Sequence, residues 1–327
     1  MRIAVLMGGL SSEREVSLAS GKEVARALRE VKHDVVEIDV RDELDASRAT
    51  SPSSNNKALA GFVTNPGIAS CDVVFVALHG GAGEDGTVQA LLDVMGKPYT
   101  GSGMLASALA MDKVLSKRIF EQAGVMTPAW RSVERANLAN VEAAVADLGG
   151  PPVVTKPRNQ GSTIGISIVK EEAELKTAVE SSLKYSPDVL VEKYIAGREM
   201  TVGVLGDSPL PVIEIAANKG FYNYECKYTR GKSKYIVPAR IPANKSKEAQ
   251  EAALKAYRVL GCQDFARVDF RLSREGELHC LEVNTVPGMT GTSLVPMAAR
   301  AKGMPFPQLV DEICRLALSR RGTGKDI

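Results

Sequence analysis

Long apolar runs are missing from this sequence of 327 residues. The longest, CDVVFVAL at 71–78 and LVPMAA at 294–299, are far shorter than the roughly 20 residues that a membrane-spanning helix needs. The first residues, MRIAVLMGG, lead into glycine and charge rather than into the apolar core of a signal peptide. We therefore expect no membrane association and a cytoplasmic location.

An excess of one sign of charge is also missing. The chain has 41 basic and 39 acidic residues, a formal net charge of +2, and no long basic cluster. Proteins that bind nucleic acid or anionic membranes usually carry a basic patch or stripe. The sequence therefore predicts no nucleic-acid partner.

Cysteine and histidine are scarce. The five cysteines lie far apart, at 71, 226, 262, 280 and 314, and none forms a C-x-x-C pair. This usage is typical of a reducing compartment and argues against a cysteine-based zinc site. With only three histidines, a histidine-rich metal centre is excluded as well, so any metal must be bound by oxygen ligands.

The first part of the chain alternates strand-like and helix-like segments. Apolar runs at 2–9, 33–40 and 71–81 are separated by an amphipathic stretch at 13–30 and by a polar connection at 45–70, which has room for one short helix. Such runs predict a parallel sheet covered on both faces, so residues 1–110 should form a doubly wound α/β domain. Its ligands should lie beyond the carboxyl ends of the strands, near Gly8-Gly9 and His79-Gly80-Gly81.

Two α+β units are expected to follow. The unit over 111–197 begins with a single helix that ends at Gly124 and continues with strand, glycine-rich turn, helix and strand. The unit over 198–327 is richer in strands, including FARVDFRL at 265–272 and ELHCLEVN at 277–284. The predicted fold class is therefore α/β and α+β.

The last two strands carry polar residues where a buried strand should be apolar. A hairpin centred near Glu275-Gly276 would place Asp269 opposite Glu282 and Arg267 opposite Asn284 on one face. Carboxylate and amide oxygens suit a hard cation such as Mg²⁺ that also binds phosphate. A solvated sheet face with alternating polar residues explains these residues equally well.

Two further segments have features of anion sites. Lys156 ends a strand shortly before the loop GSTIG (161–165), whose backbone N–H groups could cover a phosphate, although an ordinary turn is the alternative and the loop is not a P-loop. Ser293 is predicted to N-cap a helix that tolerates Pro296 and ends at Gly303. The first turn of that helix would offer free N–H groups to a carboxylate or phosphate.

Together these motifs resemble the D-alanine–D-alanine ligases of the ATP-grasp superfamily. The matching segments follow the family's order and cover 8–21, 78–113, 155–167, 191–202, 221–228 and 266–299. The resemblance implies an ATP-grasp architecture, in which the first domain binds one D-alanine and the other two enclose ATP. It also implies a homodimer that ligates two D-alanines through an acyl phosphate, giving ADP, phosphate and a dipeptide for peptidoglycan synthesis.

The resemblance implies a role for each matching residue. Two Mg²⁺ or Mn²⁺ ions would be held by Asp269, Glu282 and Asn284. Phosphates would be neutralised by three lysines, the adenine would lie near 192–195 and the ribose near Glu199. The full set of ATP-binding residues would be Lys113, Lys156, Ser162, Glu192, Lys193, Ile195, Glu199, Tyr222, Lys227 and Asn284.

The amino-acid sites follow from the same resemblance. Glu13 would hold the ammonium group of the first D-alanine beside His79, and the second substrate's carboxylate would meet Ser293 and the N–H of Leu294. Amide formation builds negative charge on a tetrahedral oxygen, which needs preorganised donors. The resemblance assigns that task to Arg267 and the Gly288 N–H, while Ser162 and Tyr228 would link two loops into a lid.

Three alternatives remain open on sequence alone. A D-alanine–D-lactate ligase would share the chemistry, but such enzymes replace the tyrosine found here at Tyr228. A nucleotide-dependent dehydrogenase would use RIAVLMGG and Asp39, although GGLSSE is not G-x-G-x-x-G. The third alternative is an inactive binding protein. Small departures from the family pattern occur at Gln160, Thr163 and Asn223, and none removes a proposed ligand.

Overall fold

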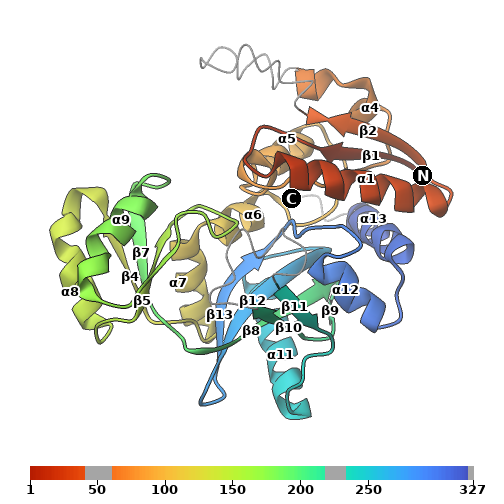
Figure 1. Cartoon of the computed structure of the whole chain (residues 1–327). Helices are drawn as coiled ribbons and strands as arrows, with labels where there is room; N and C mark the ends of the chain where they lie inside the picture. The colour runs from red at the N-terminus through yellow and green to blue at the C-terminus, as the bar shows by residue number, and fades with distance from the viewer. Residues whose placement is uncertain (41–60, 218–232, 323–327) are drawn as a thin grey trace.

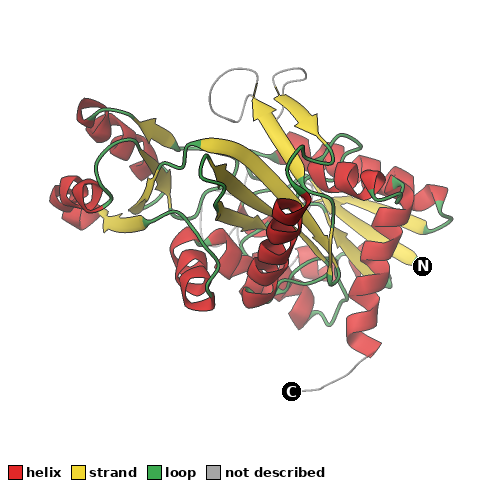
Figure 2. Cartoon of the chain, turned by 90° about the horizontal axis from the view of Figure 1, so that it is seen from below, coloured by secondary structure: helices red, strands yellow, loops and turns green. Residues whose placement is uncertain are grey.

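The chain folds into three sheets with their helices, as a computed structural model describes for residues 1–40, 61–217 and 233–322 (Figure 1). The first sheet lies at the upper right of Figure 1, a four-stranded sheet forms a lobe at the left, and the largest sheet lies below the first. Figure 2 shows the same division from below, with the smaller lobe at the left and the N-terminus at the right.

The first sheet is parallel, as predicted, with strand order β2-β1-β3. It contains β1 (Arg2–Met7), β2 (Asp34–Asp39) and β3 (Val73–Val76). Ile3 and Val5 share a core with helix α1 (Arg14–Glu30), whereas Ala4 and Leu6 share a second core with the side chains of α4 (Pro66–Ala69) and α5 (Thr87–Val94). Because successive side chains of a strand point to opposite faces, both faces of the sheet are covered.

The last helix of the chain returns to this sheet. Helix α13 (Phe306–Gly322) packs against α1, and Leu309 and Ile313 belong to the same core as Ile3 and Val5. One apolar core therefore joins the first and last segments of the sequence. Within the described ranges no helix is both long and apolar enough to cross a membrane.

The four-stranded sheet is antiparallel, with order β4-β7-β5-β6. Its strands are β4 (Trp130–Glu134), β5 (Val153–Pro157), β6 (Ser167–Val169) and β7 (Asp188–Lys193). Helices α8 (Val141–Asp147) and α9 (Leu175–Leu183) bury one face and, with the strands, form a separate core. The loop between β5 and β6 contains Ser162.

The largest sheet has the order β11-β10-β8-β12-β13, with β9 paired to β8. Its strands are β8 (Gly197–Leu205), β9 (Ser208–Pro209), β10 (Ile213–Ala217), β11 (Ser233–Ile236), β12 (Phe265–Ser273) and β13 (Leu278–Asn284). Helix α11 (Ala243–Val259) buries its alanines against this sheet, and α12 (Leu294–Ala301) follows β13. The sheet thus presents β12 and β13 as neighbours.

The single helix predicted to end at Gly124 is in fact two. Helices α6 (Met104–Met111) and α7 (Lys113–Ala123) are separated by Asp112, whose backbone is extended. The Asp112 carboxylate accepts hydrogen bonds from the N–H groups of Val114 and Leu115, both at 3.0 Å, and so caps α7. Helical periodicity continues through a cap of this kind, so the prediction was wrong at Asp112. It was right at Gly124, which adopts the left-handed C-cap conformation.

Candidate active site

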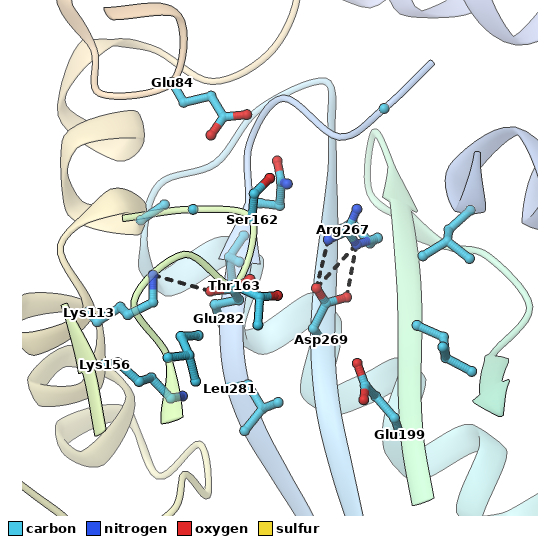
Figure 3. Close-up of a pocket in the computed structure, with 18 of the residues that line it drawn as sticks. Glu84, Lys113, Lys156, Ser162, Thr163, Glu199, Arg267, Asp269, Leu281 and Glu282 are labelled. Atoms are coloured by element: carbon cyan, nitrogen blue, oxygen red, sulfur yellow. Dashed lines mark hydrogen bonds and ion pairs between the residues drawn. The ribbon is translucent and has the colours of Figure 1, made fainter. Parts of the chain in front are cut away.

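A cleft of about 490 Å³ lies where the three sheets meet. Figure 3 shows side chains from the first unit, the smaller lobe and the largest sheet pointing into it. Tyr222, Lys227 and Tyr228 fall outside the described residues. Every other predicted site residue lines the cleft, namely Glu13, His79, Lys113, Lys156, Ser162, Glu192, Lys193, Ile195, Glu199, Arg267, Asp269, Glu282, Asn284, Gly288, Ser293 and Leu294.

The β12–β13 hairpin has the predicted register. Arg267 pairs with Asn284 and Asp269 pairs with Glu282 across the two strands. A register shift follows directly after Asp269, between Asp269 and Phe270. The neighbouring strand β8 supplies Thr201, whose hydroxyl donates to Asp269 Oδ1 at 2.6 Å.

Arg267 and Asp269 form an ion pair on this face. Arg267 Nε lies 2.9 Å from Asp269 Oδ1, and Nη2 lies 2.8 Å from Oδ2. Both side chains are mostly buried, at 13% and 14% exposure, and Figure 3 shows the pair beside Glu282. A fork-to-carboxylate contact of this kind fixes the orientation of both groups.

The acid-amide face fits a hard cation. Asp269 and Glu282 offer carboxylates and Asn284 an amide oxygen, which also accepts from the Val286 N–H at 3.0 Å and keeps a second lone pair. Among the described residues no three His, Cys, Asp or Glu side chains group into a metal site, so this face supplies only part of a shell. Mg²⁺ commonly takes one or two carboxylates together with phosphate oxygens and water. The alternative of a solvated sheet face does not fit, because Asp269 is largely buried beside Arg267.

Lys113 reaches this face from the first residue of α7. Its ammonium group lies 3.3 Å from Glu282 Oε2 (Figure 3). It also donates to the Gln160 carbonyl at 2.7 Å. Because Asp112 starts a new helix, Lys113 turns toward the cleft instead of continuing α6. The break between α6 and α7, which the sequence did not reveal, therefore positions Lys113, the lysine predicted to bind phosphate.

Arg158 fixes the base of the Gly/Ser loop to that break. Its guanidinium group contacts Asp112 at 2.8 Å and Asp188, at the start of β7, at 2.8 Å. Burial alone raises the pKa of Asp112, but Arg158 and the capping N–H groups outweigh burial and hold it below its ordinary value. Asp112, Arg158 and Asp188 were not predicted as site residues, since each resembles an ordinary surface charge in the sequence.

Glu192 is enclosed by two lysines. Glu192 is 2% exposed, and its Oε2 lies 2.6 Å from Lys156 while its Oε1 lies 3.1 Å from Lys117. Burial raises the pKa of Glu192, but the two ammonium groups outweigh it, so the pKa falls below its ordinary value. The sequence does not single out Lys117, because a lysine within an amphipathic helix usually faces water.

Glu13 and Ser162 meet at the other end of the cleft. Ser162, in the Gly/Ser loop, donates its hydroxyl hydrogen to Glu13 Oε1. Ser162 and Thr163 adopt left-handed backbone conformations, with φ of 53° and 63°, which aim the loop at Glu13. Gly80 has φ of 70°, and a Cβ there would lie 2.8 Å from Glu13 Oε2, so only glycine leaves room for this carboxylate.

His79 is held by two protein groups. Its Nδ1 lies 3.0 Å from the Val286 carbonyl, which can only accept, so Nδ1 carries a hydrogen, and Nε2 pairs with Ser20 Oγ at 3.0 Å. Glu84, which was not predicted, lines the same end of the cleft with Oε1 3.7 Å from His79 Nδ1. A second carboxylate therefore stands near Glu13.

Helix α12 begins after Ser293 as predicted and ends at Ala301, two residues before Gly303, but Ser293 does not cap it with its side chain. Ser293 occupies the N-cap position, yet its Oγ accepts from the Thr290 N–H at 3.0 Å and pairs with Thr290 Oγ1 at 2.8 Å. The preceding turn competes successfully for the hydroxyl. The first N–H groups of α12, including that of Leu294, receive no side-chain cap from Ser293, and both residues line the cleft.

Asp39 does not serve a Rossmann-type nucleotide site. Its carboxylate is bound by both terminal nitrogens of Arg14, with Nη1 to Oδ1 at 2.7 Å. It also lies against Gly8, where a Cβ would approach Asp39 Oδ1 to 2.1 Å. An aspartate enclosed by an arginine and the glycine turn does not suit ribose binding. The dehydrogenase alternative is thereby disfavoured.

Comparison with known proteins identifies the family. The family model described as D-ala D-ala ligase C-terminus matches residues 119–315, and the model described as D-ala D-ala ligase N-terminus matches residues 2–102. The chain belongs to the D-alanine–D-alanine ligase family. The predicted ATP-grasp architecture and fold class are therefore confirmed.

Relatives of the family resemble this chain over its whole length. The D-alanine–D-alanine ligase of Moorella thermoacetica is 49% identical over 325 residues, covering 97% of this chain and 99% of the relative. That of Aquifex aeolicus is 45% identical over 315 residues, covering 96% and 99%. A crystal structure of the Bacillus anthracis ligase complexed with ATP is 33% identical, has a TM-score of 0.81, and matches over 99% of both chains.

Proposed function

We propose that this chain is an ATP-dependent ligase that joins two D-alanines into D-alanyl-D-alanine, a peptidoglycan precursor. ATP phosphorylates the carboxylate of the first D-alanine, and the amine of the second attacks the acyl phosphate, releasing ADP and phosphate. One observation carries this proposal beyond the family relationship. Lys113, Lys156, Arg267, Asp269 and Glu282 converge on one cleft, as a phosphoryl transfer followed by attack on a carbonyl requires.

In the first step the protein positions ATP and neutralises its charge. We infer that Lys113 and Lys156 bind phosphate oxygens, with Lys227, and that Ser162 and Tyr222 cover the nucleotide. Glu192, Lys193 and Ile195 would line the adenine, and Glu199 would bind the ribose. Asp269, Glu282 and Asn284 would hold two Mg²⁺ or Mn²⁺ ions, which when bound neutralise charge on the phosphate oxygens.

In the second step the protein orients two amino acids and stabilises the tetrahedral oxygen. Glu13 holds the ammonium group of the first D-alanine beside His79, and Ser293 with the Leu294 N–H receives the carboxylate of the second. Arg267 and the Gly288 N–H donate to the carbonyl oxygen, which becomes negative as the C–N bond forms and loses that charge when the carbonyl re-forms and phosphate leaves. Ser162 and Tyr228 close the site against water, which would otherwise hydrolyse the acyl phosphate.

Our proposals for the oligomeric state and the cellular location of the protein rest on the family relationship. We infer a homodimer, and a cytoplasmic location where ATP and D-alanine are both available. Analytical ultracentrifugation at micromolar concentration checks the first point, and fractionation of cells with an antibody against this chain checks the second. A monomer under assay conditions would contradict the homodimer.

One assay tests the reaction. Purified protein is incubated with ATP, Mg²⁺ and D-alanine, and phosphate and dipeptide are measured against samples with no amino acid and with L-alanine. We expect one phosphate for each D-alanyl-D-alanine and no product from L-alanine. Phosphate release no higher than in the sample without amino acid would contradict the ligase function. Added D-lactate distinguishes the ester-forming alternative, which would yield a D-alanine–D-lactate product at neutral pH.

A further inference from the structure

Lys117 is a lysine without solvent exposure. Its side chain is 0% exposed and is among the largest fully buried side chains of the described residues. Lysine is almost never fully buried unless it is paired. Burial holds the pKa of Lys117 below its ordinary value, and the carboxylate of Glu192 opposes that shift in part. We therefore expect the ammonium group of Lys117 to have a role that an apolar side chain at this position of α7 could not fill.

The partners of Lys117 match a charged ammonium group. Three acceptors surround Nζ: Glu192 Oε1 at 3.1 Å, Thr127 Oγ1 at 2.6 Å and the Pro128 carbonyl at 3.3 Å. The Thr127 hydroxyl donates its own hydrogen to the Cys280 carbonyl at 2.8 Å, so it can only accept from Lys117. Lys117 donates hydrogen bonds to Thr127 and to the Pro128 carbonyl, and its contact with Glu192 Oε1, which accepts no hydrogen bond from the described residues, is an ion pair.

Glu192 lies between Lys117 and a lysine of the nucleotide site. Its second oxygen, Oε2, is 2.6 Å from Nζ of Lys156, which lines the cleft. With two ammonium groups and one carboxylate, the three side chains carry one net positive charge. If Lys117 were neutral, Glu192 would cancel the charge of Lys156, and the group would present no net charge to a phosphate.

The structure assigns Lys117 as a positioning residue of the nucleotide site. Its positive charge offsets the negative charge of Glu192, so the charge of Lys156 remains available to the phosphates of ATP. This inference rests on the proposed function. Lys117 itself does not need to touch the nucleotide, because it acts through Glu192. Thr127 also links Lys117 to β13, because its hydroxyl donates to the carbonyl of Cys280, two residues before Glu282. The contact between Lys117 and Thr127 therefore holds α7 against the strand that carries a proposed metal ligand.

The inference predicts an order of affinities set by net charge. The measured quantity is the ratio of the dissociation constant of adenosine to that of ADP, by calorimetry in EDTA so that no metal contributes. Changes in adenine contacts affect both ligands and cancel in the ratio. The charge of the three side chains is +1 in the wild type, 0 in K117M, +2 in E192Q and +1 again in K117M/E192Q.

We expect the ratio to fall on the order of tenfold in K117M, to rise by a similar factor in E192Q, and to return to the wild-type value in K117M/E192Q. Arg118→Met, which removes a positive charge from the exposed neighbour on α7, should leave the ratio within about twofold because water screens it. Removing one partner of a buried pair destabilises more than removing both. If K117M does not fold, the ratios of the wild type, E192Q and the double variant still show whether Lys117 contributes charge to phosphate binding.

A ratio that is the same in E192Q and K117M/E192Q overturns the inference, because Lys117 would then contribute no charge to phosphate binding. Loss of stability with an unchanged ratio overturns it too, since that result assigns Lys117 a purely structural role. If the wild type binds neither ligand and releases no phosphate with D-alanine, the proposed function itself fails. The two failures are therefore distinguishable.

Discussion

Arg267 donates to both carboxylate oxygens of Asp269, two residues further along β12 and on the same face of the strand. The proposed donor to the reacting oxygen and a proposed metal ligand thus hold one another in place. Each fixes the other's orientation, so a change in either residue disturbs both. The step that suffers most should still differ between them, because only Arg267 is placed to meet the charge that develops during amide formation.

Arg267→Lys should lower kcat by about 10² to 10³-fold, because an ammonium group cannot replace the fork that both pairs with Asp269 and donates to the reacting oxygen. The KM for ATP should stay within about threefold, since ATP is bound by other residues. Steady-state kinetics of dipeptide formation measure both values. Arg131→Lys, in an exposed ion pair with Asp147, is the control. A change in kcat smaller than about fivefold would exclude this role for Arg267.

Asp269→Asn should raise the Mg²⁺ concentration for half-maximal activity by about 10-fold or more, because an amide oxygen is a weaker ligand than a carboxylate for a hard cation. High Mg²⁺ should restore part of the activity. Titration of activity with Mg²⁺ at saturating ATP measures the effect, with Asp147→Asn as the exposed control. An unchanged Mg²⁺ requirement with reduced kcat would instead limit Asp269 to orienting Arg267.

Ser162→Ala should uncouple ATP use from dipeptide formation. The hydroxyl that joins the Gly/Ser loop to Glu13 is lost, and a hydrogen bond to a charged group contributes about 1.5–3 kcal/mol. We expect kcat/KM for D-alanine to fall about 10- to 100-fold, and phosphate to exceed dipeptide because water reaches the acyl phosphate. Parallel assays of the two products give their ratio, and Ser167→Ala in β6 is the control. Equal amounts of phosphate and dipeptide would show that Ser162 does not keep water out.

Asp264→Asn should alter the pH dependence of stability. Asp264 is 5% exposed, accepts from the Gly101 N–H at 2.8 Å and lies 3.0 Å from Arg320 of α13. Burial raises the pKa of Asp264 from 3.8 to about 6, although Arg320 and the Gly101 N–H oppose the shift. Because the folded state binds this proton more tightly than the unfolded state, the contribution of Asp264 to stability falls as pH rises from about 4 to about 7.

Urea unfolding of wild type and Asp264→Asn between about pH 4 and pH 7 checks this sign. The free energy of unfolding of the wild type minus that of the variant should fall with pH by up to about 3 kcal/mol, from the pKa change of about two units at 1.36 kcal/mol each. Asp207→Asn, which removes an exposed carboxylate, should give a difference that does not vary with pH. A flat difference for Asp264→Asn as well would mean that Asp264 does not titrate with a raised pKa.

The sequence by itself determined the elements whose pattern repeats locally. The alternation of side chains along 265–273 and 278–284, with a glycine turn between them, was sufficient to place Asp269 opposite Glu282. The parallel strands of the first sheet were predictable for a similar reason, since runs buried on both faces are continuously apolar. Each of these predictions rests on a side-chain pattern within a single strand or hairpin.

Only the tertiary structure decided where distant segments meet. Lys117 and Glu192 are 75 positions apart, and nothing in the amphipathic pattern of α7 distinguishes a lysine that faces water from one that is enclosed by a carboxylate, a hydroxyl and a carbonyl. The sequence likewise did not reveal that α13 packs on the first sheet. Nor did it reveal that Thr290 competes with α12 for the Ser293 hydroxyl. Backbone periodicity is a local property, whereas burial of a charge depends on which partners the folded chain brings to it.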